Sequence, residues 1–317
     1  MESGTSVSVE VAELSKELAA VDLDLDTDDP ASSDLVAVRP TENAGMGVFA
    51  LRDIPRGTRI SAEAPLVAIP PGPDKESAIR FCEALAGISP RDLARVDRHH
   101  CDPKTLQAVA TTAIGVEILR WCEAHFGALT GSNNASSSSS PRPTDRGLQD
   151  LAAKTCRRYA IFLTNNLDTG AAQGRGFFHL FSRMNHSCAP NVFDHYNPSL
   201  RRLTSHALRD VRAGEQLFSH YIDLLMPRRA RQRKLATWGF VCACPVCSSD
   251  LRESLRLRAI ELDDMVEEFA EYADDPALWA ADEKPAVLDA AEALDLGQKL
   301  VRLLRRQDLF GLELFNA

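Results

Sequence analysis

Three cysteines fall within six residues, in the segment Cys242-Ala243-Cys244-Pro245-Val246-Cys247. Thiolates this close in sequence can face one centre, and zinc in proteins takes four ligands in a tetrahedron. A Cys-x-x-Cys redox pair would use Cys244 and Cys247 but would leave Cys242 without a role. The pattern therefore predicts a zinc site with a fourth ligand from elsewhere in the chain. Four thiolates would make the site structural, because no position stays open for water.

Cys188 is the best candidate for the fourth ligand. It lies in the polar, turn-like stretch 185–191, where a thiol has no apolar core to pack into. His186 and Cys156 are alternatives. The first residues lack the basic and apolar stretches of a secretory signal, so we expect an intracellular protein, nuclear or cytoplasmic. In such a reducing compartment a cysteine cluster more often binds metal than forms disulfides.

The net charge of −9 lies entirely in residues 1–34, which hold ten acidic residues and one lysine. We expect this leader to be disordered, and a strand that docks on a partner is the alternative. The neutral remainder argues against a nucleic-acid-binding protein, including a zinc module for DNA. For the basic run 228–234 a solvated helix face is favoured over a surface for nucleic acid or an acidic substrate. The sequence contains no run of 18 apolar residues, so no membrane-spanning helix is predicted.

Hydrophobic spacing predicts an α+β fold in which strands are split by a helical insert and followed by more helices. Strands are expected over residues 36–38, 48–51, around 60, 67–69, 176–181, 192–196, 203–208 and from 214. Helices are expected over residues 76–86, 103–126, 148–163, 253–273 and 285–304. The serine-rich stretch 130–144 is expected to be a flexible tether within the insert.

Three separated strings carry a family resemblance. They are Asn43-Ala44-Gly45-Met46-Gly47-Val48-Phe49-Ala50, then Arg183-Met184-Asn185-His186-Ser187-Cys188-Ala189-Pro190-Asn191, and finally Gly214–Asp223 followed by Trp238–Cys247. In this order they resemble the SET-domain protein lysine methyltransferases, most closely the SET-and-MYND type. The resemblance covers residues 35–71 and 156–248. The MYND zinc module is missing, because the cysteines before Cys156 lack paired spacing.

The resemblance implies a SET fold of several small curled β-sheets. Its core would comprise residues 35–71 and 156–241, with the helical insert at 72–155. A post-SET zinc loop would follow at 242–250 and a C-terminal helical cap at 251–317. The implied activity is transfer of a methyl group from S-adenosylmethionine to a lysine of a protein substrate, by a chain expected to be monomeric.

The resemblance also implies roles for individual residues. Tyr221 matches the catalytic tyrosine. The cofactor-binding positions would be Gly45, Met46, Gly47, Asn165, Asn185, His186, Tyr221 and Phe240. The lysine channel would be lined by Leu167, Tyr221 and Trp238, and zinc would be held by Cys188, Cys242, Cys244 and Cys247. Leu167 stands where an aromatic residue is common, so a catalytically weak adaptor that binds protein partners is the alternative function.

Overall fold

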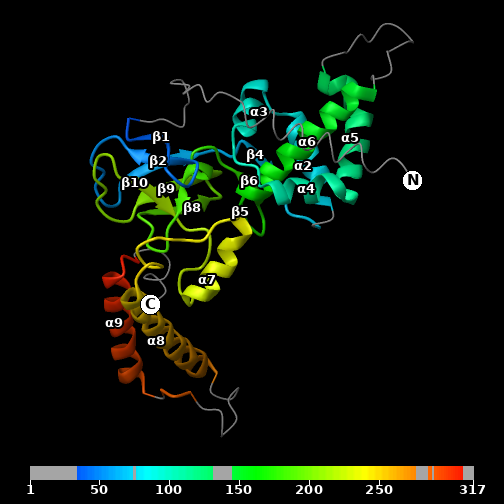
Figure 1. Ribbon diagram of the computed structural model, residues 1–317. Coiled ribbons are helices and arrows are strands. Elements are labelled where there is room, and N and C mark those ends of the chain that lie inside the picture. The colour runs from blue at the N-terminus through cyan, green and yellow to red at the C-terminus, as the bar shows by residue number, and fades with distance from the viewer. Residues whose placement is uncertain (1–33, 74–75, 131–144, 276–284, 288, 310–317) are drawn as a thin grey trace.

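The computed structural model describes residues 34–73, 76–130, 145–275, 285–287 and 289–309. Within these ranges, short strands form three small sheets, and helices lie on either side of the sheet region (Figure 1). The predicted α+β class is therefore confirmed. The acidic leader 1–33 and the serine-rich stretch 131–144 lie outside the described residues.

The first sheet places the Asn-His string beside the tyrosine string. Its strands lie in the order β1 (Val36–Pro40), β2 (Met46–Ala50), β10 (Gln216–Ser219) and β7 (Asn185–His186). β7 runs parallel to β10, with Asn185 opposite Phe218 and His186 opposite Ser219. Tyr221 follows β10 by two residues, so this pairing brings it close to His186. Val48 and Leu217 are fully buried and anchor the sheet in the core.

The other two sheets flank the first and join the core to the insert (Figure 1). One has the order β3 (Arg59–Glu63), β9 (Arg202–Ala207) and β8 (Val192–Asn197). The other has the order β4 (Val67–Ile69), β6 (Gly174–Phe177) and β5 (Leu167–Gly170). β5 was not predicted, and the strand expected over 176–181 ends at Phe177. A 3-10 turn, η2 (Phe181–Arg183), follows soon after.

A partly buried carboxylate from β3 stabilises the turn η2. The Glu63 oxygens accept hydrogen bonds from the backbone N–H groups of Leu180 (2.7 Å) and Phe181 (2.9 Å). Burial raises the pKa of Glu63 to about 7, although these hydrogen bonds act to lower it.

This raised pKa predicts a loss of stability with rising pH. The folded carboxyl group binds its proton more tightly than an unfolded glutamate with a pKa of about 4.5, so its contribution is fully present below that pH. The free energy of unfolding should fall as the pH rises through 7, and Glu63→Gln should remove this dependence. Urea unfolding of both proteins between pH 5 and 8 measures the effect. Identical pH dependence in the two would contradict it.

The insert is a cluster of helices against the β4–β6–β5 sheet. The helices are α2 (Ser77–Ala86), α3 (Pro90–Asp97), α4 (Pro103–Thr111), α5 (Ala113–Thr130) and α6 (Asp145–Asn165). The prediction of a single helix over 103–126 is wrong. The backbone of Thr112 is extended (φ −111°, ψ −177°), and this break separates α4 from α5. Helix α6 crosses residue 155, where the insert was expected to end.

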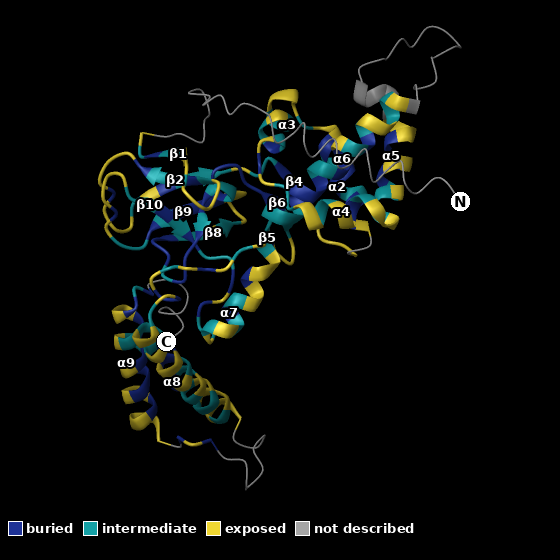
Figure 2. Cartoon of the chain, in the orientation of Figure 1, coloured by how far each residue is buried: buried dark blue, intermediate teal, exposed yellow. Residues whose placement is uncertain are grey.

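The C-terminal part begins with α7 (Arg228–Leu235) and the turn η3 (Ala236–Trp238). After the cysteine loop, α8 (Asp250–Asp274) and α9 (Ala290–Arg306) pack against each other. Figure 2 marks buried residues of α9 on the side that faces α8. The buried leucines Leu262, Leu296 and Leu300 belong to one apolar cluster with the cysteine loop. The helical pair is therefore fixed to the loop rather than tethered beside it.

Candidate active site and metal centre

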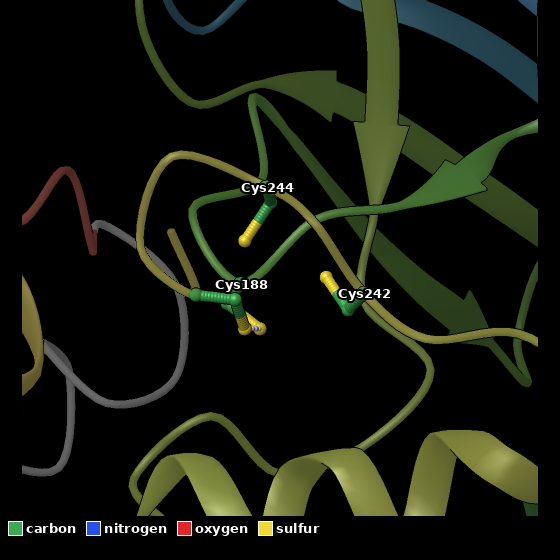
Figure 3. A group of neighbouring side chains, drawn as sticks. Cys188, Cys242 and Cys244 are labelled. Atoms are coloured by element: carbon green, nitrogen blue, oxygen red, sulfur yellow. Dashed lines mark hydrogen bonds between the residues drawn. The ribbon is translucent and has the colours of Figure 1, made fainter. Parts of the chain in front are cut away.

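Four cysteine sulfurs meet at one point. Cys188 comes from the loop after β7, and Cys242, Cys244 and Cys247 come from the loop between η3 and α8. Their sulfur atoms all lie within 4.8 Å of one another. Figure 3 shows the sulfurs of Cys188, Cys242 and Cys244 pointing into a common space. The expected partnership of Cys188 with the three-cysteine loop is thus present in the geometry.

The donor set and its burial suit zinc. Hydrogen bonds within the cluster lower the pKa of Cys244 and Cys247 and, together with burial, raise that of Cys188 and Cys242, so the four thiols share their protons closely. All eight cysteines have free thiols. Four sulfurs are the ligand type and number of a structural zinc site, and such a site has no open position. The four cysteines can therefore hold a zinc ion that links the 242–247 loop to Cys188 after β7.

Side chains around the cluster fix its backbone. The Gln232 amide donates to the carbonyl oxygen of Cys242 (2.7 Å) and accepts from its N–H group (2.9 Å). Arg256 of α8 is fully buried and donates to the carbonyl oxygens of Cys188 (3.1 Å) and Leu224. Sequence reasoning missed both residues. Gln232 precedes Cys242 by ten residues and Arg256 follows Cys247 by nine, but neither belongs to a spacing pattern that would have marked it as a contact of the loop.

The basic run 228–234 is only partly the solvated face that was predicted. Arg229, Arg233 and Lys234 are exposed, but Arg231 is fully buried against Glu253 of α8, with 2.9 Å between Nη2 and Oε2. Arg228 also bonds to α8 through Asp250. The prediction of a solvated side chain is therefore wrong for Arg231. This residue lies four positions before the buried Leu235, so the two side chains share the inward face of α7.

Four rings from three segments form a partly buried aromatic group. The Tyr221 ring centroid lies 5.4 Å from that of His186, 5.4 Å from Trp238 and 6.5 Å from Phe240. His186 is also 6.3 Å from Phe240. The predicted site residues of β7, β10 and the η3 region are thus brought together around Tyr221.

Burial sets the protonation state of this group, and hydrogen bonds fix where its protons lie. The Tyr221 hydroxyl donates to the carbonyl oxygen of Met184 (2.7 Å), and burial raises the pKa of Tyr221 to about 12. Burial lowers the pKa of His186 to about 4. Its Nδ1 accepts from the Tyr221 N–H group (3.1 Å), so its proton lies on Nε2, 3.4 Å from the Cys188 sulfur. At neutral pH both rings are therefore uncharged, and His186 links the tyrosine to the metal centre.

The glycine turn contacts Asn185, the neighbour of His186 in β7. Gly45 has φ +65°, which favours glycine, and the Asn185 Nδ2 donates to the Met46 carbonyl oxygen (3.1 Å). A Cβ atom at Gly47 would lie 3.2 Å from the Asn185 amide and 2.5 Å from that of Gln216. The backbone at Gly47 and the Asn185 amide therefore lie so close together that a side chain at position 47 would not fit without a shift.

The remaining two predicted residues lie at the end of α6 and in β5. The Asn165 Nδ2 donates to the carbonyl oxygens of Ile161 (2.7 Å) and His100 (2.9 Å), so its amide is used within the insert. Leu167 packs on an apolar cluster that includes Phe178. The Trp238 Nε1 donates to the Thr164 carbonyl oxygen (3.3 Å), which ties this segment to the aromatic group. The cofactor role of Asn165 and the channel role of Leu167 stay predictions.

The site consists of small sheets that place an Asn-His strand beside a partly buried tyrosine, with a cluster of four cysteines next to them. These features are those of a SET-type domain. The family model described as SET domain matches residues 45–222, so the chain belongs to the SET-domain family. The predicted fold class is thereby confirmed. It includes a C-terminal cysteine cluster of the post-SET kind.

Several curated proteins are similar to the chain. The Histone-lysine N-methyltransferase set5 of Schizosaccharomyces pombe is 31% identical over 226 residues, which are 71% of this chain and 54% of that protein. The human N-lysine methyltransferase SMYD2 is 33% identical over 92 residues, 29% of this chain and 21% of that protein. The chain thus spans about half of the first relative and about a fifth of the second. Among the described residues, the helices are all too short or too polar to cross a bilayer.

Proposed function

We propose that the chain transfers a methyl group from S-adenosylmethionine to a lysine side chain of a protein, with a structural zinc ion at the four cysteines. The observation that carries the proposal is that Tyr221, Trp238 and Phe240 gather with His186 in one partly buried aromatic group, while Asn185, next to His186, bonds to the glycine turn at Met46. The names of the relatives, histone-lysine and N-lysine methyltransferases, support it. We further propose an intracellular protein substrate.

The side chains of the aromatic group suit this chemistry. S-adenosylmethionine, when bound, supplies an electrophilic methyl group. A free lysine has a pKa near 10.4, so deprotonation at pH 7 costs roughly 4.6 kcal/mol. The apolar rings of Trp238 and Tyr221 penalise an ammonium group and lower this cost. Tyr221 donates its own proton to Met184, so its oxygen can accept a hydrogen bond from the amine and orient the lone pair. A phenol with a pKa of about 12 positions the amine rather than deprotonating it.

The direct test combines binding with label transfer. Calorimetry with S-adenosylmethionine should give a dissociation constant in the micromolar range. Incubation of the purified chain with the methyl-labelled compound and a protein extract should label protein lysines. Binding without labelling would favour the adaptor function, and failure of both would reject the proposal.

Substitution of Gly47 by alanine tests the cofactor site. The added Cβ atom would lie 2.5 Å from Gln216 Nε2 and 2.8 Å from Thr41 Cγ2, so these side chains and the Asn185 amide would have to shift, and a modest loss of stability is expected. It would also disturb the Asn185–Met46 hydrogen bond, and we expect affinity for S-adenosylmethionine to fall about tenfold. Calorimetry and thermal unfolding measure the two effects. Gly87→Ala is a control, because this glycine, like Gly47, does not have a positive φ, and an added Cβ atom there would meet only the Ala84 carbonyl oxygen at 3.9 Å. Equal affinity for S-adenosylmethionine in the Gly47 variant and the wild type would count against a cofactor site at the glycine turn.

A further inference from the structure

An ion pair between a fully buried arginine and a partly buried glutamate lies against the cysteine cluster. Arg231 of α7 has no exposed side-chain surface, and its Nη2 lies 2.9 Å from Glu253 Oε2 and 3.9 Å from the Cys247 sulfur. Its Nη1 donates to the Met226 carbonyl oxygen. Its Nε is buried and has no partner among the described residues. A guanidinium group is thus held between a carboxylate and a sulfur of the metal centre.

The net charge of the cysteine cluster with zinc bound explains why a positive charge next to it would be favourable. Four thiolates and one divalent ion carry a net charge of −2. Cys188, Cys242 and Cys247 are buried, so water screens this charge poorly. A neighbouring positive charge therefore stabilises the loaded centre, and a neighbouring negative charge destabilises it. Arg231 supplies the first and Glu253 the second.

We propose that Arg231 is a positioning residue and counter-charge for the metal centre, and that Glu253 opposes it, so that the pair sets how long the metal is retained. This inference rests on the zinc site of the proposed function. Because the cysteine loop carries Phe240 next to Cys242, the lifetime of the metal also sets how long the loop stays closed beside Tyr221.

The alternative is that the Arg231–Glu253 pair only joins α7 to α8, and this role predicts a different result. If the pair only joined the two helices, removing either charge would loosen the loop and speed metal loss. If Arg231 is a counter-charge, the two changes have opposite signs. Glu253→Gln keeps the size of the side chain and one acceptor oxygen, where the carboxylate accepts from the Arg228 N–H group with Oε1 and from Arg231 with Oε2. It removes the negative charge and one of these two hydrogen bonds, and the lost hydrogen bond alone would loosen the loop, so slower release would be due to the charge.

The experiment uses the full chain and zinc itself. Elemental analysis of the wild type should give one zinc per chain, and release into excess chromogenic chelator gives the rate. We expect Arg231→Met to speed release about 10–100-fold, the range seen when residues contacting metal ligands are changed. Glu253→Gln should slow release by about two- to tenfold. The double variant should lie close to wild type. Arg233→Met, an exposed arginine on the same helix, should change nothing.

The outcomes separate the two proposals. A wild type without zinc rejects the zinc site itself. Zinc in the wild type combined with faster release from Glu253→Gln overturns the counter-charge role and leaves a helix-joining pair. Thermal unfolding checks each variant. If Arg231→Met does not fold, the sign of the Glu253→Gln effect still decides, and Arg231→Lys, which keeps the charge, should release zinc more slowly than any neutral variant at that position.

Discussion

Replacement of Tyr221 by phenylalanine is expected to reduce methyl transfer by about 10²–10³-fold while leaving the affinity for S-adenosylmethionine nearly unchanged. The variant keeps the ring that contacts His186 and Trp238 but removes the only group on it that can orient an amine. The lost hydrogen bond to the Met184 carbonyl oxygen should lower the free energy of unfolding by about 1 kcal/mol. Single-turnover transfer of labelled methyl groups measures the rate, and calorimetry measures binding.

Tyr196→Phe is the matched control for this prediction. Tyr196 lies in β8 and packs near Phe178, away from the aromatic group. It should transfer methyl groups at the wild-type rate. Equal rates for the Tyr221 variant and wild type would remove Tyr221 from the reaction. A loss of cofactor binding that matched the loss of rate would make Tyr221 a binding residue instead.

Replacement of Cys188 by serine should have the largest effect on stability. Cys188 is the one cysteine of the cluster that lies outside the 242–247 loop, so losing it would detach the loop from the strand region. Structural zinc contributes roughly 10–16 kcal/mol in small zinc-binding peptides. Zinc content should fall from one per chain to near zero, and the melting temperature should drop steeply.

Cys101→Ser gives the comparison. Cys101 is a half-buried thiol of the insert, and its weak contact with the Arg157 carbonyl oxygen can be made equally by serine. It should keep its zinc and its melting temperature. If the Cys188 variant also retained one zinc per chain, the fourth ligand would have to be another group.

Residue patterns located most of the candidate site because its parts lie in short, distinctive strings. The spacing of Cys242, Cys244 and Cys247 predicted a partner outside the loop, and Cys188 was chosen because it stood in a polar turn. Hydrophobic spacing placed most strands within one or two residues. These features are local, so the sequence carries them directly.

Features that depend on distant contacts could not be predicted in the same way. Arg231 and Arg256 look like solvated helix positions in sequence, yet both are fully buried because α8 packs over the loop. The break at Thr112 has no glycine or proline to mark it. Helix α3 could have been found, since Ser89 caps it by accepting from Asp92 N and Pro90 occupies its first position.

The strand pairing described above has a consequence for the order of folding. β3 pairs with β9, where Glu63 faces Leu203, and β2 pairs with β10, where Val48 faces Leu217. Helices α2 to α6 can instead form early from neighbouring contacts, because closing long loops is slow. A ribosome-bound chain that lacks the residues beyond β9 can hold a folded insert and the β1–β2 pair, but β7 cannot join them because β10 is absent. The aromatic group around Tyr221 thus forms only after β10 and the segment up to Phe240 have been synthesised.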